Sequence, residues 1–141
     1  MITAIDSNVL LDVILLPQQK FYEASADALE SAAALGPLII CDVVYAEICG
    51  HFATQPECDF FLEGNEIRVE SLKRAALFLA SRAFRAYRRQ GGRRTHALPN
   101  FFIGAHAQLQ ATRLLSRDRG LYRKYFPALK LLDPARSGWS K

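Results

Sequence analysis

The sequence predicts a three-layer α/β/α sandwich with a mainly parallel sheet of roughly five strands. Two observations favour this fold: short apolar runs alternate with segments of helical spacing, and turn residues separate the two kinds of segment. Strands that alternate with helices pair in parallel through right-handed crossovers. The chain has 141 residues, half of them hydrophobic, which suits one domain with a single core. We expect this domain over residues 1–133, followed by a poorly ordered C-terminal tail over 134–141.

The apolar runs are the predicted strands. The run from Leu38 to Cys41 is uninterrupted, as is typical of a parallel strand buried on both faces. The five predicted strands are Ile2–Ile5, Leu38–Cys41, Ile67–Val69, Leu114–Leu115 and Leu129–Leu132.

Helical segments fill the intervals, and several of them end at a proline or a glycine. The predicted helices cover about 8–16, 22–35, 43–52, 56–62, 71–90, 99–111 and 118–125. The segment 71–90 is the longest of these; Gly91-Gly92 ends it and begins a basic loop that reaches Leu98, and Pro99 opens the next helix. Asp42 and Asp118 are the expected caps of their helices, and both Asp6 and Ser7 are candidate caps for the first helix.

Charge is distributed unevenly along the chain. Residues 1–67 hold eleven acids and one base, a net charge of −10, whereas residues 68–141 hold seventeen bases and three acids, a net charge of +14. No acid occurs from Ser71 to Arg117. A basic half of this kind suits a polyanionic partner. Alternatively, the two halves face and neutralise each other, and the two interpretations are compatible.

Neither a membrane segment nor a disulfide framework is indicated. No apolar run approaches the roughly 20 residues that span a bilayer, and the N-terminus lacks the basic region of a signal peptide. We therefore expect a cytoplasmic protein without a membrane partner. The three cysteines show no CxxC spacing, so we expect reduced and mostly buried thiols at Cys41, Cys49 and Cys58.

Four polar residues are expected just beyond the carboxyl ends of predicted strands or on helices packed there, where open α/β folds build their sites. They are Asp6, Glu47, Asn100 and Asp118. Two carboxylates about 5 Å apart repel each other by about 3 kcal/mol at an effective dielectric constant of 20, so such a cluster favours a bound cation. Oxygen ligands alone favour Mg²⁺ or Mn²⁺ over zinc. Taken singly, the two aspartates can be helix caps and Glu47 a solvated helix residue; their shared location predicts the site.

At these residues the sequence resembles the PIN-domain ribonucleases, and among them the VapC-type toxins of toxin–antitoxin pairs. The resemblance rests on four segments whose order and spacing cover nearly the whole chain. The segments are Ile5–Asp12, Val44–Ile48, Leu98–Ala107 and Leu114–Tyr122.

The resemblance implies a PIN-like fold and a metal-dependent endoribonuclease, a hydrolase that cleaves RNA phosphodiesters with a Mg²⁺-activated water; Mn²⁺ is the alternative metal. It also implies a homodimer and a small VapB-like antitoxin that holds the toxin inactive. The positions of the family's metal ligands are Asp6, Glu47, Asn100 and Asp118. Supporting polar residues of the family match Ser7, Asn8 and Ser116.

Asn100 departs from the family pattern, which carries aspartate at this position. The amide removes one negative charge but still offers a carbonyl oxygen to a metal. We therefore expect weaker metal binding and slower or absent cleavage. The asparagine is either native to the chain or an introduced change that allows a toxic protein to be expressed.

A cluster of arginines precedes the segment that carries Asn100. Arginine binds phosphate in a bidentate manner, and Tyr87 can stack on a base. The predicted RNA-binding residues are Arg85, Arg88, Arg89, Arg93 and Arg94. The same cluster can instead be a solvated helix face or the docking site of an acidic antitoxin tail.

Two hypotheses follow from the sequence. The first is a toxin that cleaves RNA, weakened by Asn100. The second is a degenerate, non-cleaving PIN module that binds RNA or an antitoxin.

Overall fold

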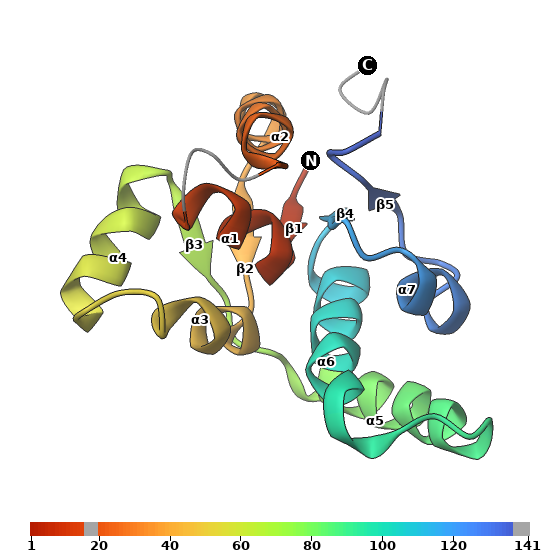
Figure 1. The fold of residues 1–141 in the computed structure, drawn as a ribbon. Helices are drawn as coiled ribbons and strands as arrows, with labels where there is room; N and C mark the ends of the chain where they lie inside the picture. Colours follow the sequence, from red (N-terminus) through yellow and green to blue (C-terminus); the bar gives the residue numbers. More distant parts are fainter. Residues whose placement is uncertain (16–19, 137–141) are drawn as a thin grey trace.

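A five-stranded, entirely parallel sheet forms the centre of the molecule (Figure 1). The computed structural model describes residues 1–15 and 20–136. Its strand order is β3-β2-β1-β4-β5, so β1 is central. The strands are β1 (Thr3–Ile5), β2 (Leu38–Ile40), β3 (Ile67–Val69), β4 (Arg113–Leu115) and β5 (Leu131–Leu132). Because all strands run in one direction, their carboxyl ends share a single edge.

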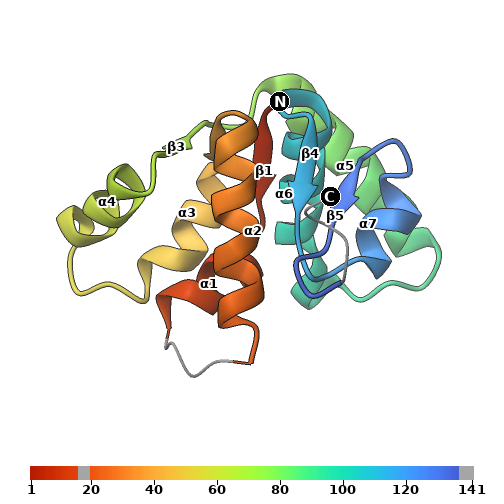
Figure 2. The same ribbon diagram turned by 90° about the horizontal axis from the view of Figure 1, so that it is seen from above.

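Helices cover the sheet on both sides. In Figure 1, α2 lies above the sheet, and the packed pair α5 and α6 lies below it; Figure 2 shows α2 running along β1. The helices are α1 (Ser7–Ile14), α2 (Tyr22–Leu35), α3 (Asp42–Cys49), α4 (Gln55–Gly64), α5 (Arg74–Arg89), α6 (Arg94–Gln110) and α7 (Gly120–Tyr125). The predicted three-layer α/β/α fold with a parallel sheet is therefore confirmed.

Two helices near the middle of the chain differ from the prediction. Helix α5 begins at Arg74 instead of Ser71, because Gln110 holds the preceding segment extended by bonding the Lys73 amide at 2.9 Å and the Ser71 carbonyl at 3.1 Å. Helix α6 begins at Arg94, so Pro99 lies inside it and does not open it. The basic loop is consequently short, and α6, with 17 residues, is longer than α5, with 16.

One predicted helix cap is confirmed and three are corrected. Asp6 caps α1 with its carboxylate, which accepts from the Ser7 amide, whereas the alternative candidate Ser7 is already helical. Asp42 is the first residue of α3 and follows the cap position at Cys41. Asp118 precedes the cap position of α7, which is Arg119. Asp42 and Asp118 therefore do not cap their helices.

Apolar side chains of the strands and of every helix layer form one continuous core. His106 of α6 packs among these side chains, with 1% of its surface exposed. No helix among the described residues is long and apolar enough to cross a membrane. The expected helix end at Leu16 and Pro17, and the tail beyond Arg136, lie outside the described residues.

Candidate functional site

Asp6 is a buried carboxylate at the carboxyl edge of the central strand β1. It is 3% exposed and accepts hydrogen bonds from four donors. One oxygen, Oδ1, accepts from the Ser7 amide at 2.7 Å. The other, Oδ2, accepts from the Ser116 hydroxyl at 2.7 Å and the Tyr122 hydroxyl at 2.8 Å, and more weakly from the Asn8 amide at 3.4 Å. The carboxylate is therefore fixed together by α1, α7 and Ser116, which directly follows β4.

Burial nevertheless raises the pKa of Asp6 above its ordinary value. Desolvation is the largest cause, and the charge of Glu47 adds to it, while the bonds from Ser116, Tyr122 and Ser7 work in the opposite direction. The pKa of Tyr122 is also raised, chiefly by burial, and the charges of Asp6, Asp118 and Glu47 contribute. The charges of three carboxylates thus raise the pKa of one buried tyrosine, which indicates that negative charge is concentrated at this edge of the sheet.

Glu47 approaches the edge from α3. Its side chain is exposed, and one carboxylate oxygen accepts a hydrogen bond from the Ser7 hydroxyl. Ser7, the first residue of α1, therefore donates its backbone amide to Asp6 and its hydroxyl to Glu47. The predicted supporting role of Ser7 has a structural counterpart in this double contact.

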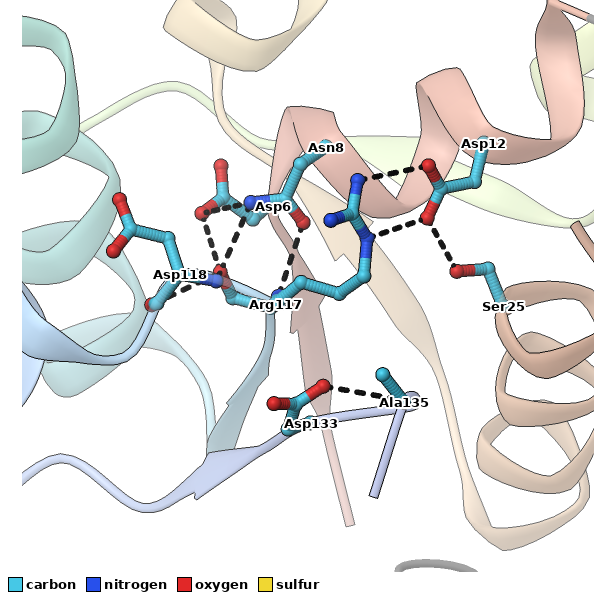
Figure 3. A network of polar contacts seen from close by, with 9 residues as sticks. Asp6, Asn8, Asp12, Ser25, Arg117, Asp118, Asp133 and Ala135 are labelled. Atoms are coloured by element: carbon cyan, nitrogen blue, oxygen red, sulfur yellow. Dashed lines mark hydrogen bonds and ion pairs between the residues drawn. The ribbon is translucent and has the colours of Figure 1, made fainter. Parts of the chain in front are cut away.

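Asp118 follows β4 in a tight turn that Ser116 organises. The Asp118 amide donates to the Ser116 hydroxyl at 3.0 Å, and the same hydroxyl lies 3.3 Å from the Asp118 carbonyl. Asn8 fixes the turn from α1, because its side-chain oxygen accepts from the Arg117 amide at 3.1 Å. Figure 3 shows Asp118 beside Asp6, with its carboxylate outside this network. The two supporting residues thus hold both acids.

Asn100 lies in the second turn of α6 and is half-buried. Among the described residues it makes no hydrogen bond to Asp6, Glu47 or Asp118. Its neighbour Phe101 packs on Tyr125 and Phe126, whose ring centroids lie 5.5 and 6.0 Å away, and this contact brings α6 against the end of α7. The structure therefore joins three of the four predicted ligands through direct contacts and shared charge effects, and leaves Asn100 without a contact to them.

Two contributors were missed from the sequence. Tyr122 lies four residues after Asp118, within the last of the four resembling segments, but this spacing does not show that its hydroxyl bonds Asp6. Arg117 was also overlooked. It binds Asp12 through Nε at 2.8 Å and Nη2 at 2.9 Å, as Figure 3 shows.

Asp12 is buried, with 4% of its surface exposed, and a buried acid requires a positive partner. The Ser25 hydroxyl donates to the same carboxylate at 2.7 Å, and the Arg117 guanidinium stacks 4.1 Å from the centre of the Phe21 ring. This clamp ties the turn between Ser116 and Asp118 to α1 and α2. Asp12 alone was a usable signal, because it is an acid among apolar residues of the predicted first helix.

The donor set fits a hard divalent cation in chemistry, because it contains only oxygen ligands. Among the described residues, however, no three acids, histidines or cysteines are placed to hold one ion together. Mg²⁺ is commonly held by one or two carboxylates and completes its shell with water and substrate phosphates. The residues therefore fit an open site with few protein ligands, and do not form a closed cage.

The predicted RNA-binding arginines lie at the end of α5 and just after it. Arg85, Arg88, Arg89 and Arg93 are exposed, and the Arg94 side chain lies outside the described part of the structure. This end of α5 contacts α7: the Tyr125 hydroxyl donates to Gln90 at 2.9 Å, and the Tyr87 and Tyr125 rings lie 5.7 Å apart. The arginine-rich end of α5 thus packs against α7, the helix whose Tyr122 donates a hydrogen bond to Asp6.

Comparison with solved structures shows a shared fold over nearly the whole chain. VapBC2 from Rickettsia felis, bound to a DNA fragment from its promoter, is similar with a TM-score of 0.70 and 18% identity, over 94% of this chain and 98% of that one. VapBC-1 from nontypeable Haemophilus influenzae has a TM-score of 0.69 and 18% identity, over 96% and 100%. FitAcB from Neisseria gonorrhoeae has a TM-score of 0.65 and 18% identity, over 95% and 98%.

No curated protein matches the sequence. The family model of the PIN domain matches residues 3–127, which is most of the chain and includes every residue of the site. Together with the buried Asp6 and the parallel sheet that carries it, this match shows that the chain belongs to the PIN-domain family.

Proposed function

We propose that this protein is a Mg²⁺- or Mn²⁺-dependent endoribonuclease that acts in the cytoplasm as the VapC-type toxin of a toxin–antitoxin pair. The observation that carries the proposal is the buried Asp6 carboxylate, which three strong hydrogen-bond donors fix in place. One of these donors is the Tyr122 hydroxyl, and the charges of Glu47 and Asp118 help to raise its pKa. Negative charge gathered at a strand edge is costly, and a cation bound there would offset the cost.

Each residue of the site has a defined task in this proposal. Asp6, Glu47 and Asp118, with the carbonyl oxygen of Asn100, would hold the metal, which when bound supplies a water of lowered pKa and neutralises charge on a phosphodiester. Ser116 and Tyr122 keep the Asp6 carboxylate in one orientation, and Ser7 orients Glu47. The exposed arginines at the end of α5 would bind the RNA backbone.

The proposed partner is a small VapB-like antitoxin. The solved structures that share this fold include VapBC assemblies and a toxin–antitoxin complex from Klebsiella pneumoniae, the latter with a TM-score of 0.63 and 19% identity. These likenesses support the partner as a hypothesis. A homodimer remains a prediction from the family resemblance.

The proposal is tested by RNA cleavage with purified protein in Mg²⁺, in Mn²⁺ and in EDTA. We expect slow cleavage that EDTA abolishes and that Asp6→Ala reduces at least a hundredfold. Asp27→Ala, which replaces an exposed acid of α2, is the matched control and should retain activity. Activity that survives EDTA or Asp6→Ala contradicts the proposal.

Asn100→Asp tests the fourth position separately. The added carboxylate should strengthen Mg²⁺ binding and raise cleavage, and it should make expression of the protein toxic to cells. Cleavage rates and the Mg²⁺ concentration at half-maximal activity are the measurements. A variant no more active than the original chain removes position 100 from the site.

The second candidate is a PIN module that binds RNA or an antitoxin without cleavage. Two observations favour it: the amide at Asn100, and the absence of three acidic, histidine or cysteine ligands placed around one point among the described residues. Tight RNA binding without cleavage, even in Asn100→Asp, would select this candidate.

A further inference from the structure

Two of the three cysteines meet at the contact between α3 and α4. The Sγ atoms of Cys49, the last residue of α3, and Cys58, in the second turn of α4, lie 3.7 Å apart. This is a contact between two reduced thiols. A disulfide requires a separation of about 2.05 Å, so the two sulfur atoms need to approach by less than 2 Å.

Neighbouring contacts keep the two helices in this register. The Tyr45 hydroxyl, one turn before Cys49, donates to Asp59 at 2.7 Å. Three residues after the end of α3, the Phe52 ring packs on Phe61 of α4, with the ring centroids 5.6 Å apart. Two further contacts therefore join the segments that carry the thiols.

The two thiols differ in their access to solvent. Cys58 is fully buried, whereas Cys49 is half-buried and lines an open cavity of about 370 Å³ together with Tyr45 and Phe52. Burial and the neighbouring Cys49 raise the pKa of the Cys58 thiol to about 11. A small oxidant thus reaches Cys49 first, and Cys58 is placed to react with it second.

We infer that Cys49 and Cys58 are an oxidation site that forms a reversible intramolecular disulfide. Hydrogen peroxide supplies the oxidising equivalents. The Cys49 sulfur attacks the peroxide oxygen, the O–O bond breaks, and a sulfenic acid and one water are formed. The Cys58 sulfur then displaces the hydroxyl group from Cys49 as a second water. In total, two thiols and one peroxide give one disulfide and two waters, and a dithiol returns the two electrons.

The bond would cross-link α3, which carries a residue of the proposed site, to α4, which carries none. Helix α3 carries Glu47 two residues before Cys49, and α4 borders an apolar groove through Phe61. The inference itself requires only the two thiols and does not depend on nuclease activity. Its failure would therefore leave the proposed function intact.

The test uses the full chain and peptide mapping after a brief treatment with hydrogen peroxide. Free thiols are alkylated under denaturing conditions, and the chain is then cut after glutamate. Cleavage after Glu47, Glu57 and Glu63 separates the peptide of Cys49 from that of Cys58, whereas trypsin leaves all three cysteines in one peptide. We expect the peptides 48–57 and 58–63 to be joined, with Cys41 alkylated and the link removed by dithiothreitol.

Variants provide the controls. Cys41→Ser should still form the link, whereas Cys49→Ser should leave Cys58 alkylated after peroxide, because Cys58 is buried. Oxidation should also raise the Tm of the original chain by roughly 5 °C, since a loop of about ten residues is closed. Absence of the link, a link to Cys41, a link between two chains, or a sulfinic acid at Cys49 as the main product would each overturn the inference.

Discussion

Single side chains decide how charge is tolerated inside this small domain. Three strong hydrogen bonds stabilise the buried Asp6 carboxylate, although burial raises its pKa. An ion pair with Arg117 stabilises the buried Asp12 carboxylate. His106 is a third buried polar residue, and its Nε2 makes no hydrogen bond among the described residues. Burial lowers its pKa, although the nearby acids Glu70 and Asp42 act in the opposite direction.

The buried histidine makes stability depend on pH. Because the pKa of His106 is lower in the folded than in the unfolded chain, the unfolded state binds its proton more tightly. Its contribution is therefore fully present above the unfolded pKa of about 6.5 and is lost as the pH falls toward the folded pKa. We expect the original chain to lose stability relative to His106→Gln between pH 7.5 and pH 5.5.

Urea unfolding at both pH values measures this difference, in the presence of EDTA to exclude metal effects. His51→Gln, at an exposed histidine, is the matched control and provides the baseline. The difference in the free energy of unfolding between the original chain and His106→Gln should depend on pH. If this difference is the same at both pH values, or if the original chain becomes relatively more stable at pH 5.5, the lowered pKa of His106 is contradicted.

At the scale of elements, the sequence predicted most of the architecture and part of the site. Helix α2 and strand β3 have the predicted bounds, because helical spacing, glycine and proline mark them without ambiguity. The start of α6 differs from the prediction. Proline is favoured in the first turn of a helix, but α6 begins five residues before Pro99, at Arg94, and packs on α5 through the contacts of Phe101 with Phe84 and Tyr87.

For the site, acids at strand ends were recognisable, but their partners were not. The bonds of Tyr122 to Asp6 and of Arg117 to Asp12 join residues more than 100 positions apart. Spacing along the chain carries no information about such pairs. They follow from the parallel pairing of β1 with β4, which becomes visible only in the assembled sheet.

The packing of α6 on α7 depends on a glycine. A Cβ atom built at Gly104 would lie 2.7 Å from the Phe126 ring, whereas one at Gly64, in the last position of α4, meets nothing within 4 Å. We expect Gly104→Ala to lower the free energy of unfolding by about 1–3 kcal/mol, because overpacking outweighs the gain in helix propensity. Gly64→Ala is the matched control and should be neutral or slightly stabilising; equal effects at the two sites would contradict this explanation.

The clamp between β4 and the first two helices gives a prediction for a contact between elements. Arg117→Met leaves the Asp12 carboxylate buried with Ser25 alone, so we expect a loss of about 3 kcal/mol in the free energy of unfolding. Adding Asp12→Asn should recover part of this loss, because the uncompensated charge disappears. Additive effects of the two changes in denaturant titrations would show that the ion pair is not the cause.

Across the whole molecule, the uneven charge of the sequence becomes a division in space. The acidic half builds β1, β2, the first residue of β3 and α1 to α4, and the basic half builds the rest of β3, β4, β5 and α5 to α7. Apart from β3, the division runs between β1 and β4 (Figure 1). Within residues 1–15 and 20–136, Arg117–Asp12 is the one ion pair, and it crosses this division. The halves therefore do not neutralise each other through a series of ion pairs.

The basic side gives a prediction for the proposed RNA binding. Replacing Arg85 and Arg89 by glutamine removes two exposed charges, and we expect the slope of log K against log salt to become shallower by about 1.4 for single-stranded RNA. Arg68→Gln, an exposed arginine on edge strand β3, is the control and should leave the slope unchanged. Filter binding over a range of salt concentrations measures the slopes, and an unchanged slope in the double variant would place the RNA elsewhere.

The division of charge between the two sides of the sheet has a consequence for encounters in solution. Opposite net charge on two halves of one small body gives the protein a large permanent dipole moment, directed across the junction of β1 and β4. The field of a polyanion exerts a torque on such a dipole before any contact is made, and rotates the protein so that its basic side faces the polyanion. Asp6 and Ser116 lie on this junction, so the molecule approaches a polyanion with that edge of the sheet already oriented beside it.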